Sequence, residues 1–436
     1  MLLLVFNGGT KGQGRLHFNS LVFIVRYAVS DRLILLVNSR ASYYFSLGLS
    51  LLKGFQQVGV DCKVIDWANG EAVVVAEIAR LQPTVVFEIN KTRNQSGIIP
   101  SEVIHIGWIH DSWYIDDRSG DKKSHCYDQN FGGSEITYFL LNPEYFALES
   151  RLGGLLSWSL LKTGVDIDQY YPCDTITNES AASICGYIPE PLSVYDEFLG
   201  MSVLSCSGKS PVTAGYLIDR LMNYYKVSVA KHSVRDVYHF ITTELNQKLG
   251  LNVDDDFVIK HFGNHWLLLL MDTELPRMND RFAVAEGVVS AGLQLSIYGP
   301  GQWERWPKFK PFYKRNLCWS SELADVYRAT RFNIHNGALG MHSRVLDIMA
   351  CSGVVFVNKN SHGNVDDIES NFTAGIDYIE YEMESISDDL SFWIGREKQL
   401  VEVGRSALEK VRTGHQWKHR ALQILTDINE LRHIVM

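Results

Sequence analysis

Residues 327–358 read YRATRFNIHNGALGMHSRVLDIMACSGVVFVN, and this stretch decides the predicted fold. A short buried strand is indicated around Phe332, and the polar, glycine-bearing run 336–340 ends it. Apolar residues at helical spacing predict a helix over 345–350, and the apolar run 354–357 is typical of a buried parallel strand. This βαβ order presents loop amides and a helix N-terminus to a phosphate. A βαβ unit that binds nothing has the same pattern, so the stretch alone leaves both interpretations open.

The start of the predicted helix carries one cation and one carboxylate. Arg344 and Asp347 are one helical turn apart, on the face opposite the apolar side chains. Both side chains are therefore expected beside the candidate anion site.

Length and composition restrict the class of protein. The chain has 436 residues, of which 46% are hydrophobic and 21% charged, and this predicts a folded protein of two or three domains. The formal net charge of −9 argues against a duplex nucleic-acid binder, whose phosphate contacts need a basic surface. Seven cysteines without paired CxxC spacing indicate neither a zinc knuckle nor a disulfide framework, so a reducing compartment is expected.

The N-terminal run 1–6 is apolar but short, and no basic segment precedes it, so it predicts a strand rather than a signal peptide. The glycine-bearing run 7–14 lacks both the GxGxxG spacing and the GK[ST] ending and is interpreted as a flexible turn. No stretch approaches the ~20 apolar residues that a membrane-spanning helix needs. We expect a soluble cytoplasmic protein, or one that is peripheral at the inner face of the membrane.

From Arg32 onward, apolar strand-like runs alternate with helical patterns. Strands separated by helices of this length imply a parallel sheet covered on both faces, which is a Rossmann-like half. The predicted strands are 33–37, 62–65, 84–88 and 104–108, and the predicted helices end near Val58 and Leu81.

His110 and Asp111 follow the last of these strands directly. Ligands bind at the carboxyl ends of the strands in such sheets, and a neighbouring His and carboxylate can supply a base near neutral pH. The alternative is structural: His110 bonds a loop carbonyl and Asp111 caps a turn. The residues leave the two interpretations open.

Four further segments have less specific patterns. The polar run 119–133 predicts a mobile loop at the mouth of the crevice, and 191–272 predicts a mostly helical insertion of unreadable function. Asp166 and Asp168 form a DxD triplet in a turn, where we do not expect a metal ion because no other oxygen ligands lie nearby in the sequence. The C-terminal helical pattern 416–431 is expected to pack back against the first domain.

The segment 303–319 interleaves aromatic residues with lysine and arginine. Such mixing is found where proteins stack on nucleic-acid bases and at membrane interfaces, and also in solvated loops with buried aromatic rings. We favour the last interpretation, because Pro307 and Pro311 exclude a long amphipathic helix.

The second half as a whole resembles the GT-B glycosyltransferases, with the best match to the branch of CgeB-like and group 1 transferases. The resemblance lies in the order and spacing of YGPG at 298–301, LADVYR at 323–328, FNIH at 332–335, GMHSR at 340–344, and Asp347 with ACSG at 350–353. It implies an α/β protein of the GT-B class, with two Rossmann-like domains facing a central cleft and a helical insertion in the second. The implied domains are 1–165 on the acceptor side and 166–415 on the donor side, with 416–436 as a returning helix.

The resemblance also implies site residues. A nucleotide-sugar donor would lie on the second domain, its diphosphate facing the loop and helix start at 337–344, and Asp347 would stand where the family usually has a Glu that contacts the ribose. Arg344 would pair with a phosphate, or else form a structural ion pair with a neighbouring carboxylate. The full implied donor set is Tyr298, Gly299, Gly301, Asn336, Gly337, Gly340, Met341, His342, Ser343, Arg344 and Asp347.

In such enzymes helix dipoles, amides and basic side chains hold the leaving group, so neither a metal ion nor another cofactor is expected. If the reaction inverts the sugar, Asp111 is the first choice for the base and His110 the second; a retaining reaction would not need this base. The acceptor would be a glycan, a lipid-linked sugar or a protein. Two rival functions stay open: a non-catalytic binding or scaffold protein, and an epimerase or hydrolase, which would pair Asp111 with Glu88.

Overall fold

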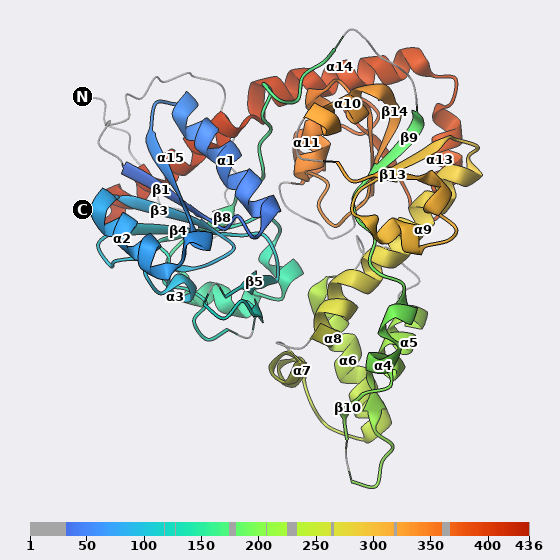
Figure 1. Ribbon diagram of the computed structural model, residues 1–436, viewed down its shortest axis with the longest axis horizontal. Helices are drawn as coiled ribbons and strands as arrows, with labels where there is room; N and C mark the ends of the chain where they lie inside the picture. The colour runs from blue at the N-terminus through green and yellow to red at the C-terminus, as the bar shows by residue number, and fades with distance from the viewer. Residues whose placement is uncertain are drawn as a thin grey trace, which may run out of the picture.

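The computed structural model describes residues 32–116, 118–126, 128–173, 180–205, 207–224, 233–262, 266–317, 321–359 and 367–435. Two six-stranded sheets form the centres of two domains that lie side by side (Figure 1). The strand predicted at 1–6 and the turn at 7–14 lie outside the described residues.

The first sheet has the strand order β2-β1-β3-β4-β7-β8, and all its pairs are parallel. Strand β1 is buried from Leu33 to Val37, as an apolar run in the middle of a parallel sheet requires. Its strands are β1 (Arg32–Val37), β2 (Asp61–Asp66), β3 (Val85–Ile89), β4 (Ile104–Ile109), β7 (Ile136–Phe139) and β8 (Trp158–Leu160). Its helices are α1 (Ser42–Gln57), α2 (Glu71–Leu81) and the short α3 (Arg93–Ser96).

The second sheet has the order β13-β12-β9-β14-β15-β16 and is also parallel. Its strands are β9 (Ser180–Cys185), β12 (Leu295–Tyr298), β13 (Tyr313–Arg315), β14 (Thr330–His335), β15 (Val355–Asn358) and β16 (Ile379–Tyr381). Its helices are α9 (Leu275–Ser290), α10 (Ser321–Ala329), α11 (Ser343–Ala350), α12 (Ile368–Asn371), α13 (Ile386–Trp393) and α14 (Glu397–Gly414). The predicted α/β fold with two Rossmann-like halves is confirmed.

The stretch 327–358 folds as β14, a loop, α11 and β15. Helix α11 buries Val345, Leu346, Met349 and Ala350 as its spacing predicts. Helix α9 begins earlier than the sequence indicated, at Leu275 rather than near Asp280, with Pro276 in its first turn, where proline is tolerated.

The insertion leaves the second domain after β9 and returns to it at α9, and it projects away from both sheets (Figure 1). Its ion pair between Arg235 and Glu149 joins it to the first domain. Its elements are α4 (Asp196–Leu199), the hairpin of β10 (Ser202–Leu204) and β11 (Val212–Thr213), α5 (Ala214–Tyr224), α6 (Val234–Leu249), α7 (Asp255–Phe262), α8 (Trp266–Leu269) and a π-helical turn, Leu270–Glu274.

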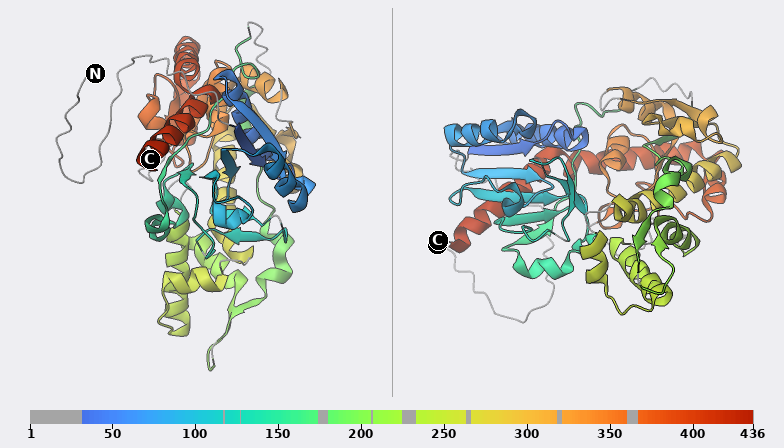
Figure 2. Two further views of the ribbon diagram at one scale, coloured as in Figure 1. Left: turned by 90° about the vertical axis from the view of Figure 1, so that its left-hand side faces the viewer. Right: turned by 60° about the horizontal axis from the view of Figure 1, so that its bottom comes forward.

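The last helix, α15 (Trp417–Val435), crosses back and lies against the strands of the first domain, as Figure 2 shows. The hydroxyl of Tyr138 donates to Asp427, and the Arg420 guanidinium donates to the carbonyl of Thr163 at 3.0 Å. A side chain at Gly54 in α1 would come within 2.6 Å of the Trp417 carbonyl, so glycine permits this close packing.

The prediction of a mobile loop at 119–133 is wrong. Strands β5 (Trp113–Ile115) and β6 (Lys122–Ser124) form an antiparallel hairpin. Fully buried His125 stacks on Tyr114, with 5.0 Å between ring centres. The polar sequence hid this hairpin because its burial comes from contacts with the rest of the first domain.

The segment 303–319 follows the favoured interpretation over its described residues, 303–317. Trp303 and Phe309 are fully buried, and the Trp303 indole donates to the carbonyl of Gly186 at 2.8 Å. Three of its basic side chains, Arg305, Lys308 and Arg315, pair with carboxylates. Among the described helices, none is long and apolar enough to cross a membrane.

Candidate functional site

A cavity of about 240 Å³, which we call the central cavity, lies between the two domains. The loop after β4 forms its first-domain side, and α9, the loop after β14 and the start of α11 form its second-domain side. The carboxyl ends of both sheets therefore open onto one space, the place where open α/β sheets bind ligands. Its charged and polar wall residues include His110, Asp111, Asp272, Arg277, Arg281, His335, Asn336, His342 and Arg344.

The second-domain side of the central cavity is cationic. Arg281 is 6% exposed, and its Nε and Nη1 have no hydrogen-bond partner among the described residues. Its guanidinium and that of Arg344 both lie close to Gly186, where an added Cβ would be 3.3 Å from the one and 3.6 Å from the other. Burial, together with Arg344 and Arg277, lowers the pKa of Arg281 to about 9, so the side chain is still charged at neutral pH.

Among the described residues Arg344 forms no ion pair within 4.0 Å, although its charge opposes the raised pKa of Asp347. Arg277 adds a third cation: its guanidinium stacks over the Tyr187 ring at 4.8 Å and lies 3.7 Å from Glu274. Of the three cations, Arg277 has a carboxylate partner, and Arg281 and Arg344 form no ion pair among the described residues, so together they leave a positive charge that attracts an anion.

The loop amides predicted to meet a phosphate are bound within the protein. The amides of Gly340 and Met341 donate to the Asp367 carboxylate at 3.0 and 2.7 Å, and the amide of Gly337 donates to Asn358 at 2.9 Å. At the start of α11, the His342 side chain accepts from the Arg344 amide. These loop amides are therefore not available to a phosphate, and the positive charge at the cavity wall comes from arginine side chains.

Asn90 holds the loop that carries His110 and Asp111. Its side-chain oxygen accepts from the amides of both residues, at 3.1 and 3.2 Å, and its amide group donates to the carbonyl of Trp113 at 2.5 Å. Its φ of 63° lies in the left-handed region, which asparagine tolerates better than most residues.

His110 is buried, and both its ring nitrogens lack a partner among the described residues although the ring borders the central cavity. Its ring packs edge-on against Trp108, with 4.1 Å between centres. Burial lowers the pKa of His110 to about 3, so the ring is neutral and offers one donor and one acceptor to a ligand.

Asp111 lines the cavity with an exposed side chain, and its carboxylate accepts from the Tyr44 hydroxyl. Desolvation raises the pKa of Asp111 to about 6, against the pull of Arg277 and Lys122. A carboxyl that titrates near neutral pH can act as a general base.

The structure separates the other predicted donor residues. Ser343 and Asp347 border a different cavity of about 220 Å³, beside Lys53 of α1 and the crossing at Gly164. Burial raises the pKa of Asp347 well above its usual value, although Arg344 opposes the rise. Tyr298, Gly299, Gly301, Gly340 and Met341 do not line the central cavity; Asn336, Gly337, His342 and Arg344 do.

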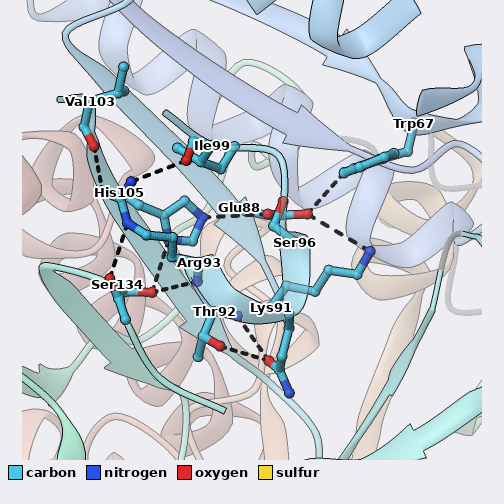
Figure 3. Close-up of polar contacts among 12 residues, drawn as sticks. Trp67, Glu88, Lys91, Thr92, Arg93, Ser96, Ile99, Val103, His105 and Ser134 are labelled. Atoms are coloured by element: carbon cyan, nitrogen blue, oxygen red, sulfur yellow. Dashed lines mark hydrogen bonds and ion pairs between the residues drawn. The ribbon is translucent and has the colours of Figure 1, made fainter. Parts of the chain in front are cut away.

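Glu88, the carboxylate that an epimerase or hydrolase would add to Asp111, is 1% exposed and fully engaged (Figure 3). It accepts from the Trp67 indole at 2.9 Å and meets His105 at 3.4 Å. The other ring nitrogen of His105 contacts the Ser134 hydroxyl at 2.9 Å. This resembles a catalytic triad, but Ser134 is fully buried and accepts from the Arg93 amide, so the network braces the sheet.

The DxD residues form a turn. Asp166 pairs with Lys53 at 2.6 Å and accepts from the amide of Asp168. Among the described residues, no group of three or more His, Cys, Asp or Glu side chains is arranged to hold a metal ion.

Sequence reasoning missed Arg277, Arg281, Asn90 and Asp272. The two arginines are four residues apart, so one face of a helix presents both, and this signal was readable. Only Arg277 depends on α9 starting five residues before the predicted point, since Arg281 lies within the predicted helix. Asn90 and Asp272 had no local signal, since each acts through residues distant in the sequence.

Comparison with known proteins identifies the domain type. Residues 281–426 match the family model described as glycosyl transferase-like. No curated protein matches the chain.

Solved structures give the fold. Sucrose-phosphate synthase from Thermosynechococcus elongatus is 8% identical, with a TM-score of 0.52 over 93% of this chain and 100% of that one. HepE from Anabaena, solved with UDP and glucose, is 9% identical with a TM-score of 0.47, over 92% and 100% of the two chains. At such identity the first likeness shows the fold and nothing finer. The chain has the GT-B fold, and residues 281–426 of it are similar to the glycosyl transferase-like family.

Proposed function

We propose that the protein transfers a sugar from a nucleoside-diphosphate sugar, bound against the second domain, to an acceptor presented by the first. The observation that carries this is the buried guanidinium of Arg281, which has unpartnered nitrogens and lies beside Arg344 in the interdomain cavity. A buried cation without a counter-ion is costly, and a bound anion would remove that cost.

A diphosphate fits this wall better than a monovalent anion does. Arg277, Arg281 and Arg344 supply three cations, and guanidinium groups bind phosphate oxygens in pairs. These cations would also stabilise the charge that develops on the diphosphate as the sugar leaves, which makes the reaction independent of a metal ion in this proposal. Asp347 faces a separate cavity, so the ribose contact implied by the resemblance requires the nucleoside to reach past Ser343.

The first-domain side supplies the groups for the transferred sugar and the acceptor. Neutral His110 offers hydrogen bonds to the hydroxyls of the sugar, and Asp111 takes the proton of the acceptor hydroxyl in an inverting reaction. Asn90 accepts from the backbone amides of both residues and so holds the loop that presents these side chains.

The test is nucleotide binding followed by turnover. UDP-, GDP-, dTDP-, ADP- and CMP-sugars are screened by thermal shift, and a nucleotide that binds should raise Tm in a concentration-dependent way. Arg344→Ala should weaken the binding of that nucleotide by about tenfold to a hundredfold, since it removes a charged hydrogen-bond donor. Arg412→Ala, an exposed arginine of α14, is the control.

Unchanged nucleotide affinity in Arg344→Ala would remove this residue from the site. Nucleotide binding without any transfer or hydrolysis of the sugar would instead favour the scaffold alternative.

A further inference from the structure

Two cavities lie between the domains, and one side chain separates them. The first is the central cavity, of about 240 Å³. The second has a volume of about 220 Å³, and we call it the crossing cavity, because Gly164 and Trp417 of the two interdomain crossings line it. Of the described residues, Tyr43 alone lines both cavities. This side chain, from the first turn of α1, therefore forms the partition between the two spaces.

The start of α11, on the other side of the cleft, holds this partition in place. The Tyr43 ring stacks on the His342 ring, with 6.3 Å between ring centres and 17° between planes. The Tyr43 hydroxyl is hydrogen-bonded to the Ser343 side chain. His342 lines the central cavity and Ser343 lines the crossing cavity. Tyr43 thus reaches from one cavity to the other, and these two contacts join the first domain to the second.

The two cavities carry groups that suit the two ends of one ligand. Arg344 lines the central cavity beside Arg281, whereas Asp347 lines the crossing cavity. Arg344 and Asp347 are three residues apart on α11, which is about 4.5 Å along the helix axis. A nucleoside attached to a diphosphate beside the arginines would therefore extend into the crossing cavity, and the Tyr43 side chain stands in that path.

The volumes agree with a site that is joined on binding. Ligand sites of proteins usually measure about 300–1,000 Å³. Each of the two cavities alone is smaller than that, and the two together fall within this range. They become one site of ordinary size when the Tyr43 side chain turns away.

Tyr43 has room to turn. It is only partly buried, unlike Leu47 one helical turn later, which is 5% exposed. No side chain caps the start of α1, so the first turn of this helix lacks one of the usual sources of stability. The movement breaks one ring stack and one hydrogen bond, each of which contributes little by itself.

We propose that Tyr43 is a gate, which separates the two cavities in the ligand-free protein and turns out of the passage when a nucleoside diphosphate binds across both. The diphosphate then lies beside Arg281 and Arg344, and the nucleoside lies in the crossing cavity. This inference rests on the proposed function. It adds to that function a residue of the first domain that controls access to a site on the second.

A gate of this kind affects long and short ligands differently. Its displacement lowers the apparent affinity for a nucleoside diphosphate by the fraction of the protein in which the gate is open. A smaller side chain removes this cost and a larger one increases it. Inorganic diphosphate needs only the arginines of the central cavity, so its affinity is independent of the gate.

The experiment is calorimetric titration of the full-length protein with two ligands, inorganic diphosphate and the nucleoside diphosphate that gives the largest thermal shift. Tyr43→Ala opens the passage, Tyr43→Trp obstructs it further, and Ser50→Phe fills the crossing cavity from α1. The control is Tyr171→Ala, on a tyrosine that is 49% exposed and lines neither cavity.

We expect Tyr43→Ala to bind the nucleoside diphosphate about tenfold more tightly, and Tyr43→Trp and Ser50→Phe to bind it about tenfold more weakly. All three variants and the control should bind inorganic diphosphate within about twofold of the unaltered protein. If Tyr43→Ala does not fold, Tyr43→Phe replaces it. That variant loses only the hydrogen bond to Ser343, and it should bind the nucleoside diphosphate about threefold more tightly.

Unchanged or weaker binding of the nucleoside diphosphate to Tyr43→Ala would overturn the gate, because Tyr43 would then be neutral or would hold the ligand. Equal changes in affinity for the two ligands would also overturn it. Normal binding to Ser50→Phe would remove the nucleoside from the crossing cavity. All three results leave the proposed function intact. If the unaltered protein binds no nucleotide, the proposed function itself fails and the gate fails with it.

Discussion

The two sides of the interdomain space differ in charge and in how their charged groups are held. On the second-domain side, Arg281 and Arg344 are cations without counter-ions. On the side of the first domain and the insertion root, desolvation raises the pKa values of the Asp111, Asp272 and Glu274 carboxyls to about 6, 8 and 7. The unpaired cations on the second-domain side attract an anion. The carboxyls on the other side have pKa values near neutral, so they can gain or lose a proton at physiological pH. A donor that leaves as an anion and an acceptor that gives up a proton need these two environments.

Asp111→Asn should produce the largest effect, because it removes the proton acceptor while keeping the size of the side chain. We expect kcat to fall by about 10² to 10⁴, the usual contribution of a general base, with nucleotide affinity changed less than threefold. Steady-state kinetics and nucleotide titration measure the two quantities. Normal turnover in the variant would show that the Asp111 carboxyl does not act in catalysis.

Arg281→Met should produce the next largest effect and distinguishes a ligand-binding cation from a structural one. We expect the affinity for the nucleoside diphosphate to fall about a hundredfold, while the ligand-free protein becomes equally or more stable, because an unpaired buried charge is replaced by an apolar chain. Calorimetric titration measures the nucleotide affinity, and urea unfolding measures the stability of the ligand-free protein. A less stable protein with normal affinity would mean that Arg281 serves the fold.

Asp272→Asn should have the smallest effect, on the pH dependence of folding. The pKa of the Asp272 carboxyl is higher in the folded chain than in the unfolded one, so its stabilisation is present below about pH 4 and is lost as the pH rises through about 8. The free energy of unfolding should therefore fall less between pH 6 and pH 9 in the variant than in the wild type. Urea unfolding at both values, with Asp256→Asn as the control, measures this. Parallel losses in all three proteins would contradict a buried carboxyl at this position.

The sequence predicted the βαβ unit at 327–358 because its strand and helix periods are local properties. It predicted loop amides free for a phosphate, and the structure differs because Gly340 and Met341 donate to Asp367, a partner more than twenty residues away. Such a choice of partner depends on tertiary packing and leaves no local pattern. The hairpin at 113–124 was missed for the same reason.

The insertion also shows that local structure was predictable and distant contacts were not. Helical spacing indicated its helices, and the structure has them. Its contact with the first domain, through Arg235 and Glu149, joins positions far apart in the chain. A contact between such distant positions leaves no pattern within one stretch of the sequence.

The returning helix α15 bears on how this protein can be divided. Its crossing runs beside the first one: Val165 pairs with Gln416, and the Val165 amide donates to the His415 carbonyl at 3.0 Å. A fragment that ends before this crossing lacks the helix that covers Gly54 and bonds Tyr138, so it leaves an apolar face of α1 uncovered. The first domain is therefore a discontinuous folding unit, and a separately expressed first domain needs residues 416–435 supplied as a covalent fusion or as a peptide in trans.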